Sequence, residues 1–376
     1  METIMSANGT DTPRVGILGT GTIFRAYARG LAGSAHLPIV RVADLDLDRA
    51  RAAAQEWHIP AWGTADDLLA DPNVDIVVNL TPPQAHASLT GAALQAGKHV
   101  YVEKPLAATT AEARGNLAVA KETGRVLGGA PDTFLGAAGQ TARAALDGGL
   151  IGRPFAATSF VRSARVERWH PDPSFLFRSG GGPVLDWGPY HVAALVNLFG
   201  PVTQVVGATT RALDELVVTA PDRRVDRIEV EVDTHATALL QFASGPVVTA
   251  MYSFDVWDTT LPHIEVYGTE GTLQIPNPNH FDDPVLIRRR TADEWSELPS
   301  VIARVSPEER GPFRGPGVAD LAGHIAGDVH RASGEFAYHV LEVLESLAER
   351  RLSDGVTAIT STVERPAPVR GAASSS

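Results

Sequence analysis

The chain has 376 residues, 44% of them hydrophobic and 20% charged, which is the composition of an ordinary folded protein and a length that favours two domains. The net charge of −12 argues against the basic surface on which non-specific binding to nucleic acid or to an anionic membrane depends. The absence of cysteine excludes disulfides, thiol nucleophiles and thiolate zinc sites, so we expect no metal site.

The first 130 residues alternate short apolar runs with Ala- and Leu-rich helical patterns. The runs that we expect to be strands are RVGILG (14–19), IVRVAD (39–44), VDIVVNLTP (74–82), KHVYVEKP (98–105) and RVLGGAP (125–131). Continuously apolar strands that alternate with helices form a parallel sheet covered on both faces. Residues 1–130 are therefore predicted to form a doubly wound α/β domain.

The pattern changes in residues 131–376, where strands follow one another through short turns. Examples are IEVEVDTHATALLQF (228–242), PVVTAMYSFDVW (246–257) and HIEVYGTEGTLQI (263–275). Helices are expected near Asp186 and over 335–351, where apolar residues recur at helical spacing. We predict an α+β domain with a large, mostly antiparallel open sheet, which would bind substrate and support oligomerisation.

A glycine-rich stretch, GTGTIF (19–24), follows the first predicted strand and begins a helix. Glycine at positions 19 and 21 lets backbone N–H groups approach a pyrophosphate at a helix N-terminus. Gly19, Gly21, Thr22 and Ile23 are therefore candidate cofactor-binding residues. Phe24 replaces the third glycine of the usual dinucleotide-binding fingerprint.

An acidic residue ends the second predicted strand, at Asp44. A carboxylate at this spacing accepts hydrogen bonds from the adenosine ribose of NAD and would repel the 2′-phosphate of NADP. Asp44 therefore favours NAD, although Arg41 and Arg49 are close enough in sequence to keep NADP as the less favoured alternative.

Two motifs, TPPQAH (81–86) and AGKHVYVEKPLA (96–107), resemble those of the Gfo/Idh/MocA oxidoreductases. The resemblance continues through GLIGRP (149–154), GGGPVLDWGPY (180–190) and YGTEGTL (267–273). It implies an N-terminal Rossmann domain that binds a nicotinamide cofactor and a C-terminal open sheet. It also implies activity on sugars, inositols and related alcohols.

The resemblance also implies residue roles. Thr81, Pro82 and His86 would border the adenosine half of the cofactor, and Glu103 and Lys104 would lie by the nicotinamide. Lys104 also follows a predicted parallel strand, and ligands bind at the carboxyl ends of such strands.

The usual family helix carries Asp, three residues and then His, whereas here Tyr190 is the fourth residue after Asp186 and His191 comes one place later. In one continuous helix, positions four apart lie about 40° apart around the axis. This spacing places Tyr190 on the face of Asp186 and turns His191 away.

We therefore expect Lys104, Asp186 and Tyr190 to be the catalytic residues. Tyr190 would exchange the hydroxyl proton, helped by the nearby ammonium of Lys104, which would also polarise the substrate oxygen. Asp186 would hydrogen-bond a neighbouring hydroxyl and orient the reacting carbon.

A long segment before this helix, residues 160–183, is rich in arginine and aromatic residues. Arg162, Arg168, His170 and Arg178 are candidate substrate-binding residues, because guanidinium groups suit carboxylate or phosphate and aromatic faces suit sugar rings. An acidic sugar or glycoside is one hypothesis, and ion pairs or solvent-facing arginines are the alternative.

Asp132 follows the fifth strand, where the family commonly has Asn and then Arg, and it is a further substrate-binding candidate. A Gly/Pro-rich loop at 311–320 carries Arg314 and could close over the site.

The function that these residues favour is NAD-dependent hydride transfer to or from a sugar-like secondary alcohol. The alternative is an NAD-dependent glycosidase, in which transient oxidation acidifies a neighbouring C–H, the leaving group is eliminated, water adds and the hydride returns. A cofactor-sensing protein without catalysis is disfavoured because Lys104, Asp186 and Tyr190 are all present.

The expected partners are a carbohydrate or glycoside and further copies of the chain, associated through the open sheet. We expect no nucleic acid as a partner, because the net charge is −12. We also expect no membrane as a partner, because no apolar run is long enough to span a bilayer. The first 14 residues lack the order of a secretory signal, so we expect a loose tail there and a cytoplasmic location.

Overall fold

The computed structural model describes residues 12–32, 36–163, 166–304, 313–348 and 350–369. Contacts between Cα atoms divide the chain into two units, residues 1–132 with 306–337 and residues 133–305 with 338–376. The loose tail predicted for residues 1–14 falls almost wholly outside the described ranges. Within those ranges, no helix is long and apolar enough to cross a membrane.

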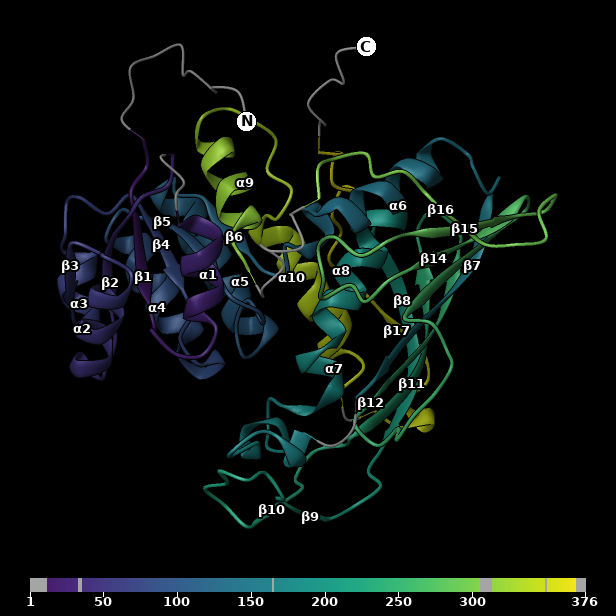
Figure 1. The fold of residues 1–376 in the computed structure, drawn as a ribbon, viewed down its shortest axis with the longest axis horizontal. Helices are drawn as coiled ribbons and strands as arrows, with labels where there is room; N and C mark the ends of the chain where they lie inside the picture. Colours follow the sequence, from purple (N-terminus) through teal and green to yellow (C-terminus); the bar gives the residue numbers. More distant parts are fainter. Residues whose placement is uncertain (1–11, 33–35, 164–165, 305–312, 349, 370–376) are drawn as a thin grey trace. The chain divides into compact units, whose positions relative to one another are not determined.

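The first unit contains a six-stranded sheet whose strands are all parallel, in the order β3-β2-β1-β4-β5-β6 (Figure 1). The strands are β1 (Val15–Leu18), β2 (Ile39–Ala43), β3 (Ala61–Gly63), β4 (Ile76–Asn79), β5 (His99–Val102) and β6 (Leu127–Gly129). All residues of β1 and β4 are buried, as expected for strands covered on both faces. The predicted doubly wound sheet is confirmed.

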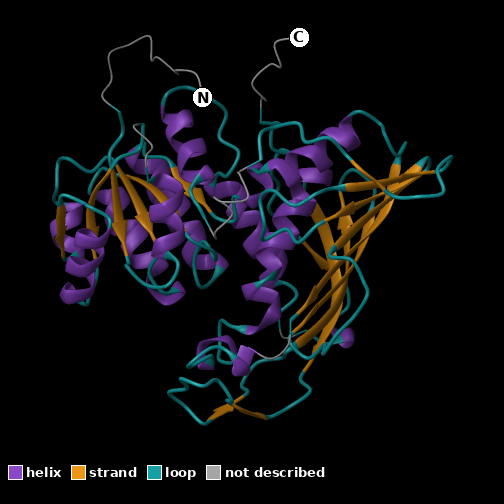
Figure 2. Cartoon of the chain, viewed as in Figure 1, coloured by secondary structure: helices purple, strands orange, loops and turns teal. Residues whose placement is uncertain are grey.

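Helices connect these strands and enclose them, as Figure 2 shows. They are α1 (Phe24–Leu31), α2 (Leu47–Glu56), α3 (Ala65–Leu69), α4 (Pro83–Gln95) and α5 (Thr110–Thr123). Several of these helices begin at a residue whose side chain caps the helix N-terminus. Asp46 accepts a hydrogen bond from the backbone N–H of Arg49 at the start of α2, and Thr109 forms a capping box with Glu112 at the start of α5.

A later segment returns to the first unit and carries α9 (Pro316–Ile325) and the start of α10 (Gly334–Glu345). The backbone N–H of Arg314 donates to the carbonyl of Ala26 at 2.9 Å, and that of Gly129 donates to Ala332 at 3.0 Å. The predicted boundary near residue 130 misses this return, because backbone pairing between residues so distant in sequence leaves no local signal.

The second unit contains a nine-stranded sheet in the order β16-β15-β14-β13-β7-β12-β11-β8-β17. Its strands are β7 (Pro154–Arg162), β8 (Val202–Thr210), β11 (His235–Phe242), β12 (Val247–Ser253), β13 (Ile264–Gly268), β14 (Gly271–Ile275), β15 (Leu286–Arg289), β16 (Ser296–Glu297) and β17 (Thr357–Ala358). Within this sheet only the β7–β12 pair is parallel. The predicted large, mostly antiparallel sheet is confirmed.

One face of this sheet is covered by helices α6 (Ala137–Asp147), α7 (Gly182–Asp186) and α8 (Gly188–Phe199) (Figure 1). Every residue of α8 is buried. Burial alternates along β11 and β12, and Leu239 and Val247 are exposed on the other face. A separate hairpin, β9 (Glu215–Val217) with β10 (Arg227–Glu229), lies beyond one end of the sheet (Figure 1).

Candidate active site

Gly19 follows β1 in a conformation that only glycine adopts readily, with φ of +93°. A Cβ atom at this position would lie 2.9 Å from the carbonyl carbon and oxygen of Leu80, which follows β4. The glycine therefore lets the loop after β1 pack directly against the loop after β4. These two loops hold most of the predicted cofactor-binding residues.

The next turn leaves backbone donors open. A Cβ atom at Gly21 would meet no atom within 4 Å, so the space in front of this residue is free. Gly21, Thr22 and Ile23 precede the first residue of α1. In the described part of the chain, their N–H groups donate to no backbone carbonyl in this turn. Three open donors at the start of α1 fit the pyrophosphate of a dinucleotide.

Asp44 lies at the end of β2 and binds the glycine loop. Its Oδ2 accepts the backbone N–H and the hydroxyl of Thr20, both at 2.8 Å, and its Oδ1 pairs with Nη2 of Arg49 at 2.6 Å. Although burial raises the pKa of Asp44, the hydrogen bonds from Arg49, Thr20 and Asp46 lower it to about 2. The carboxylate is therefore charged at neutral pH and orders the glycine loop.

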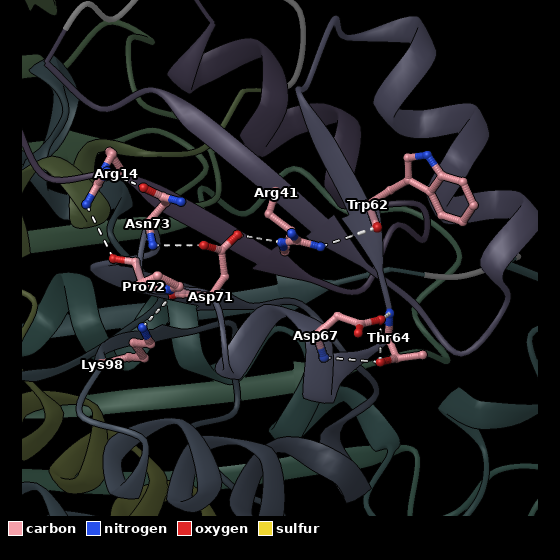
Figure 3. A network of polar contacts seen from close by, with 9 residues as sticks. All are labelled: Arg14, Arg41, Trp62, Thr64, Asp67, Asp71, Pro72, Asn73 and Lys98. Atoms are coloured by element: carbon pink, nitrogen blue, oxygen red, sulfur yellow. Dashed lines mark hydrogen bonds and ion pairs between the residues drawn. The ribbon is translucent and has the colours of Figure 1, made fainter.

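The two arginines that kept NADP open in the sequence both have acidic partners. Nε of Arg41 lies 2.7 Å from Oδ2 of Asp71, in the polar network of Figure 3 that joins β2 to the loop before β4. In the same network the ammonium of Lys98 donates to the carbonyl of Asp71 at 2.7 Å. Arg49 is the nearer candidate for a 2′-phosphate, but its present partner is Asp44 itself.

His86 in α4 connects two predicted cofactor loops. Its Nε2 lies 2.7 Å from the carbonyl oxygen of Thr81 and its Nδ1 lies 2.6 Å from that of Pro105. Burial lowers the pKa of His86, so the neutral ring donates to one of these carbonyls at a time. The side chain of Asn79 accepts the Thr81 hydroxyl at 2.6 Å and orders the same turn, with Pro82 as the N-cap of α4.

Glu103 is buried, and its side chain is directed into the protein. Oε1 accepts the hydroxyl of Tyr27 at 3.0 Å, and Oε2 accepts the backbone N–H of Lys104 at 2.7 Å. Burial and the charge of Glu103 raise the pKa of Tyr27, so the phenol keeps the proton that it donates. Glu103 thus fixes the backbone that carries Lys104, and its predicted position by the nicotinamide stays a prediction.

Asp132 is fully buried within the first unit. Its Oδ2 accepts the backbone N–H of Gly317 in the first turn of α9 at 2.8 Å, a helix position that favours a carboxylate. Burial raises the pKa of Asp132, against the nearby charge of the buried Arg314. Asp132 and Arg314 are thus both buried inside the protein, where Asp132 binds the start of α9. A substrate contact for Asp132 stays a prediction.

Asp186 and Tyr190 do not lie in one continuous helix, as the spacing argument assumed. Asp186 ends α7, Trp187 is a turn residue, and α8 starts at Gly188. Pro189 has no N–H with which to continue the helical bonds to Leu185, which explains the break. The prediction that one continuous helix carries both Asp186 and Tyr190 is therefore wrong, and helix spacing does not rank Tyr190 above His191.

The surroundings of the two side chains still distinguish them. His191 is fully buried, and its Nδ1 lies 2.8 Å from the hydroxyl of Ser159 in β7. Burial lowers the pKa of His191 well below its usual value. Tyr190 is also buried, with its ring edge-on to Trp187 at a centroid distance of 6.5 Å. His191 packs onto the sheet, whereas Tyr190 packs beside the residue that follows Asp186.

Arg162 at the end of β7 lies in a group of hydrogen-bonding atoms that lack partners. Buried Nη1 of Arg162, Nε2 of His191 and Nδ1 of His263 have no hydrogen-bond partner in the described structure. The two histidine rings lie 6.0 Å apart. Burial and then the charge of Arg162 lower the pKa of His263 to about 4. Buried polar atoms without hydrogen-bond partners are costly and indicate a place for water or a polar ligand.

The other predicted substrate residues have partners of their own. The guanidinium of Arg168 lies 5.9 Å from the centre of the Trp257 ring, and exposed Arg178 pairs loosely with Glu231 at 3.8 Å. Nδ1 of His170 accepts the backbone N–H of Asp172 at 3.1 Å. Such contacts agree with the alternative interpretation, in which the arginines form ion pairs or face solvent. The substrate roles of Arg168, His170 and Arg178 stay predictions.

Residue-by-residue reasoning missed several side chains that order the site. Thr20, Asn79 and Tyr27 each bond a predicted functional residue. Ser159 bonds His191, the neighbour of Tyr190. Thr20 lies inside the glycine stretch and Asn79 ends a strand, so both could have been identified from their positions in the sequence. Tyr27 and Ser159 gave none, because their partners are distant in sequence.

Comparison with known families identifies both parts of the chain. Residues 13–129 match a family model described as "Oxidoreductase family, NAD-binding Rossmann fold", and residues 140–274 match the GFO/IDH/MocA C-terminal domain. The chain is 36% identical to 1,5-anhydro-D-fructose reductase of Ensifer adhaerens, over 76% of this chain and 82% of the relative. It is 34% identical to dTDP-3,4-didehydro-2,6-dideoxy-alpha-D-glucose 3-reductase of Streptomyces violaceoruber, over 79% and 84%.

Solved structures share the fold. Levoglucosan dehydrogenase in complex with NADH and levoglucosan superposes with a TM-score of 0.78 at 19% identity, covering 92% of this chain and 99% of the other. An NAD-binding oxidoreductase from Klebsiella pneumoniae gives 0.78 at 23% identity, covering 93% and 100%. The resemblance inferred from the motifs, and the NAD-binding Rossmann domain that it implied, are confirmed.

Proposed function

The chain belongs to the Gfo/Idh/MocA family of NAD-binding oxidoreductases, and from this premise we propose that it transfers a hydride between a sugar-like secondary alcohol and the nicotinamide. The observation that carries the proposal is the open cradle of Gly21, Thr22 and Ile23 beside the charged Asp44. The relatives named above support the substrate class, since the names of both describe reductases of sugar compounds.

The chemistry needs one hydride acceptor and one proton acceptor. The nicotinamide, when bound, supplies the acceptor for the hydride that leaves the alcohol carbon. Tyr190 takes the hydroxyl proton, Lys104 polarises the oxygen that becomes a carbonyl, and Asp186 binds a neighbouring hydroxyl. Reduction runs the same steps in reverse. The support for Lys104 is its backbone, which Glu103 holds at the end of β5.

A finer proposal concerns the charge of the substrate. The group formed by Arg162, His191 and His263 offers a buried guanidinium N–H and two ring nitrogens without hydrogen-bond partners. A carboxylate would accept a hydrogen bond from Arg162, and from a histidine nitrogen that carries the proton, and would also compensate the charge of Arg162. This observation favours an acidic sugar over a neutral one at that end of the molecule.

Self-association is proposed through the face of the large sheet that carries exposed Leu239 and Val247. Exposed apolar side chains on a broad sheet favour contact with a second copy. Light scattering on the wild type and on Leu239→Glu tests this. A monomeric wild type would refute it.

The function is tested with nitrophenyl glycosides of neutral and acidic sugars and substoichiometric NAD. NADH that accumulates without nitrophenol would support simple dehydrogenation. Nitrophenol in excess of the NAD supplied, without lasting NADH, would support the glycosidase alternative. If both signals are absent there, free sugars and inositols follow, and absence of NADH with all of them would refute the proposal.

A further inference from the structure

A small hydrophobic cluster lies at the end of the large sheet where the β9–β10 hairpin is found. We call it the end cluster, and its buried members are Val166, Leu176, Phe177, Val218, Ala220, Ile228, Val230 and Phe254. These residues come from the segment after β7, from the hairpin region and from the chain after β12. The cluster therefore gives three loops one shared apolar core.

A cavity of about 200 Å³ opens beside the end cluster. Its lining residues are Ser163, Val166, Glu167, Phe177, Ala212, Leu213, Leu216, Phe254, Asp255 and Trp257. Seven of these ten are apolar, and the two charged ones, Glu167 and Asp255, are both acidic. Such a lining suits an apolar group and repels an anion.

The cavity is connected to the proposed catalytic residues through Trp187. This residue lies between α7 and α8, directly after Asp186, and it packs against the end cluster. Its ring is also edge-on to that of Tyr190. Three cluster members, Val166, Phe177 and Phe254, line the cavity as well. One continuous set of contacts therefore joins Tyr190 to the cavity wall.

The rim of the cavity is aromatic and accessible. Trp257 is 65% exposed and Leu213 is 50% exposed, although both line the cavity. The Arg168 guanidinium lies over the Trp257 ring. Apolar side chains kept at the surface around a cavity indicate a binding site.

We propose that this cavity is an aglycone subsite, which binds an uncharged aromatic or aliphatic group attached to the reacting sugar. The inference rests on the proposed function, because it extends the substrate from a sugar to a glycoside with an apolar substituent. The acidic lining excludes anionic substituents, so the carboxylate favoured by Arg162 belongs to the sugar and not to the aglycone.

The test compares phenyl and methyl glycosides of the same sugar through kcat/KM for NADH formation. Wild type should prefer the phenyl glycoside by about ten-fold, as expected for burial of one aromatic ring. A 4-carboxyphenyl glycoside should lose that preference. Equal kcat/KM for the phenyl and methyl compounds would overturn the proposal.

Leu213→Asp adds a third carboxylate to the cavity at an exposed position. It should remove most of the phenyl preference while leaving the methyl glycoside unchanged. Leu352→Asp is the matched control, because Leu352 is 74% exposed and does not line the cavity. A phenyl preference that survives Leu213→Asp would overturn the proposal.

A second measurement separates failure of the subsite from failure of the proposed function. N-phenyl-1-naphthylamine is neutral and apolar, and its fluorescence reports binding without turnover. Its affinity should fall at least five-fold in Leu213→Asp and stay constant in Leu352→Asp. Equal affinities in both variants would overturn the subsite. Turnover of the methyl glycoside tests the hydride transfer by itself.

Discussion

At the scale of single residues, Asp44 orders the glycine loop after β1, and we propose that it also sets the preference for NAD. It holds Thr20 in the glycine turn and Arg49 in α2. The carboxylate therefore pairs with Arg49, one of the two arginines that could otherwise meet a 2′-phosphate. The preference for NAD over NADP should therefore depend on the ion pair between Asp44 and Arg49 more than on either residue alone.

Asp44→Asn should raise the dissociation constant of NADH by about ten-fold or more, because hydrogen bonds to a charged group contribute about 1.5–3 kcal/mol. The dissociation constant of NADPH should rise less or fall, since repulsion is removed and Arg49 is released. Fluorescence titration with both cofactors measures the ratio. Arg51→Ala is the control, because Arg51 pairs with Asp48 elsewhere on α2. An unchanged ratio in Asp44→Asn would refute this account.

Tyr190→Phe removes one hydroxyl and keeps the ring that packs on Trp187. If Tyr190 exchanges the substrate proton, kcat should fall by about 100-fold or more while the dissociation constant of NADH stays the same. Steady-state kinetics and NADH titration give the two values. Tyr267→Phe on β13 serves as the control. A Tyr190→Phe enzyme that keeps kcat within a few-fold would show that another group moves the proton.

At the scale of elements, α1 packs so closely against the returning segment at Arg314 that an added methyl group would clash there. A Cβ atom at Gly30 would lie 1.7 Å from the carbonyl oxygen of Arg314. Gly30→Ala should therefore lower the free energy of unfolding by about 1–3 kcal/mol, as overpacking does. Gly115→Ala in α5 meets no atom within 4 Å and should raise it by about 0.5–1 kcal/mol. Thermal unfolding of both variants checks the opposite signs.

The regular elements were predictable because their signals are local. Apolar strands, glycine at position 19 and an acid at position 44 occur at fixed spacings, and they lie in the structure as the pattern indicates. The break after Asp186 was also encoded locally, by Pro189, but a spacing of four between Asp186 and Tyr190 was interpreted as one helix.

The remaining differences arise from contacts between distant residues. Arg314 pairs with the backbone of Ala26, and Asp132 binds the start of α9. Neither contact has a periodic pattern or a motif. The partners of Arg168 and Arg178 likewise come from segments far along the chain, so sequence alone left their substrate and structural roles open.

At the scale of the whole molecule, buried histidines make stability depend on pH. Burial lowers the pKa of His339 to about 4, and its Nε2 accepts the N–H of Val202 at 3.0 Å, which requires the neutral ring. An unfolded histidine binds a proton near pH 6.5. The unfolded state therefore binds more protons between about pH 6.5 and 4, and stability falls as pH falls through that range.

The melting temperature should accordingly decrease from pH 6.5 to pH 4. His339 alone contributes up to about 3 kcal/mol over this range, at 1.36 kcal/mol per pKa unit. His339→Gln should be less stable at neutral pH but should show a shallower decrease. His36→Gln changes an exposed residue and should keep the wild-type slope. Parallel curves for all three proteins would contradict the role of His339.

The central claim is that a hydride leaves a carbon of a sugar-like substrate and reaches the nicotinamide. The most direct measurement incubates the enzyme and NAD with carbon-deuterated forms of the sugars that give NADH, followed by mass spectrometry of the cofactor. The account predicts NADH that carries one deuterium from the sugar. NADH without deuterium, or no NADH from any sugar or inositol, would contradict it.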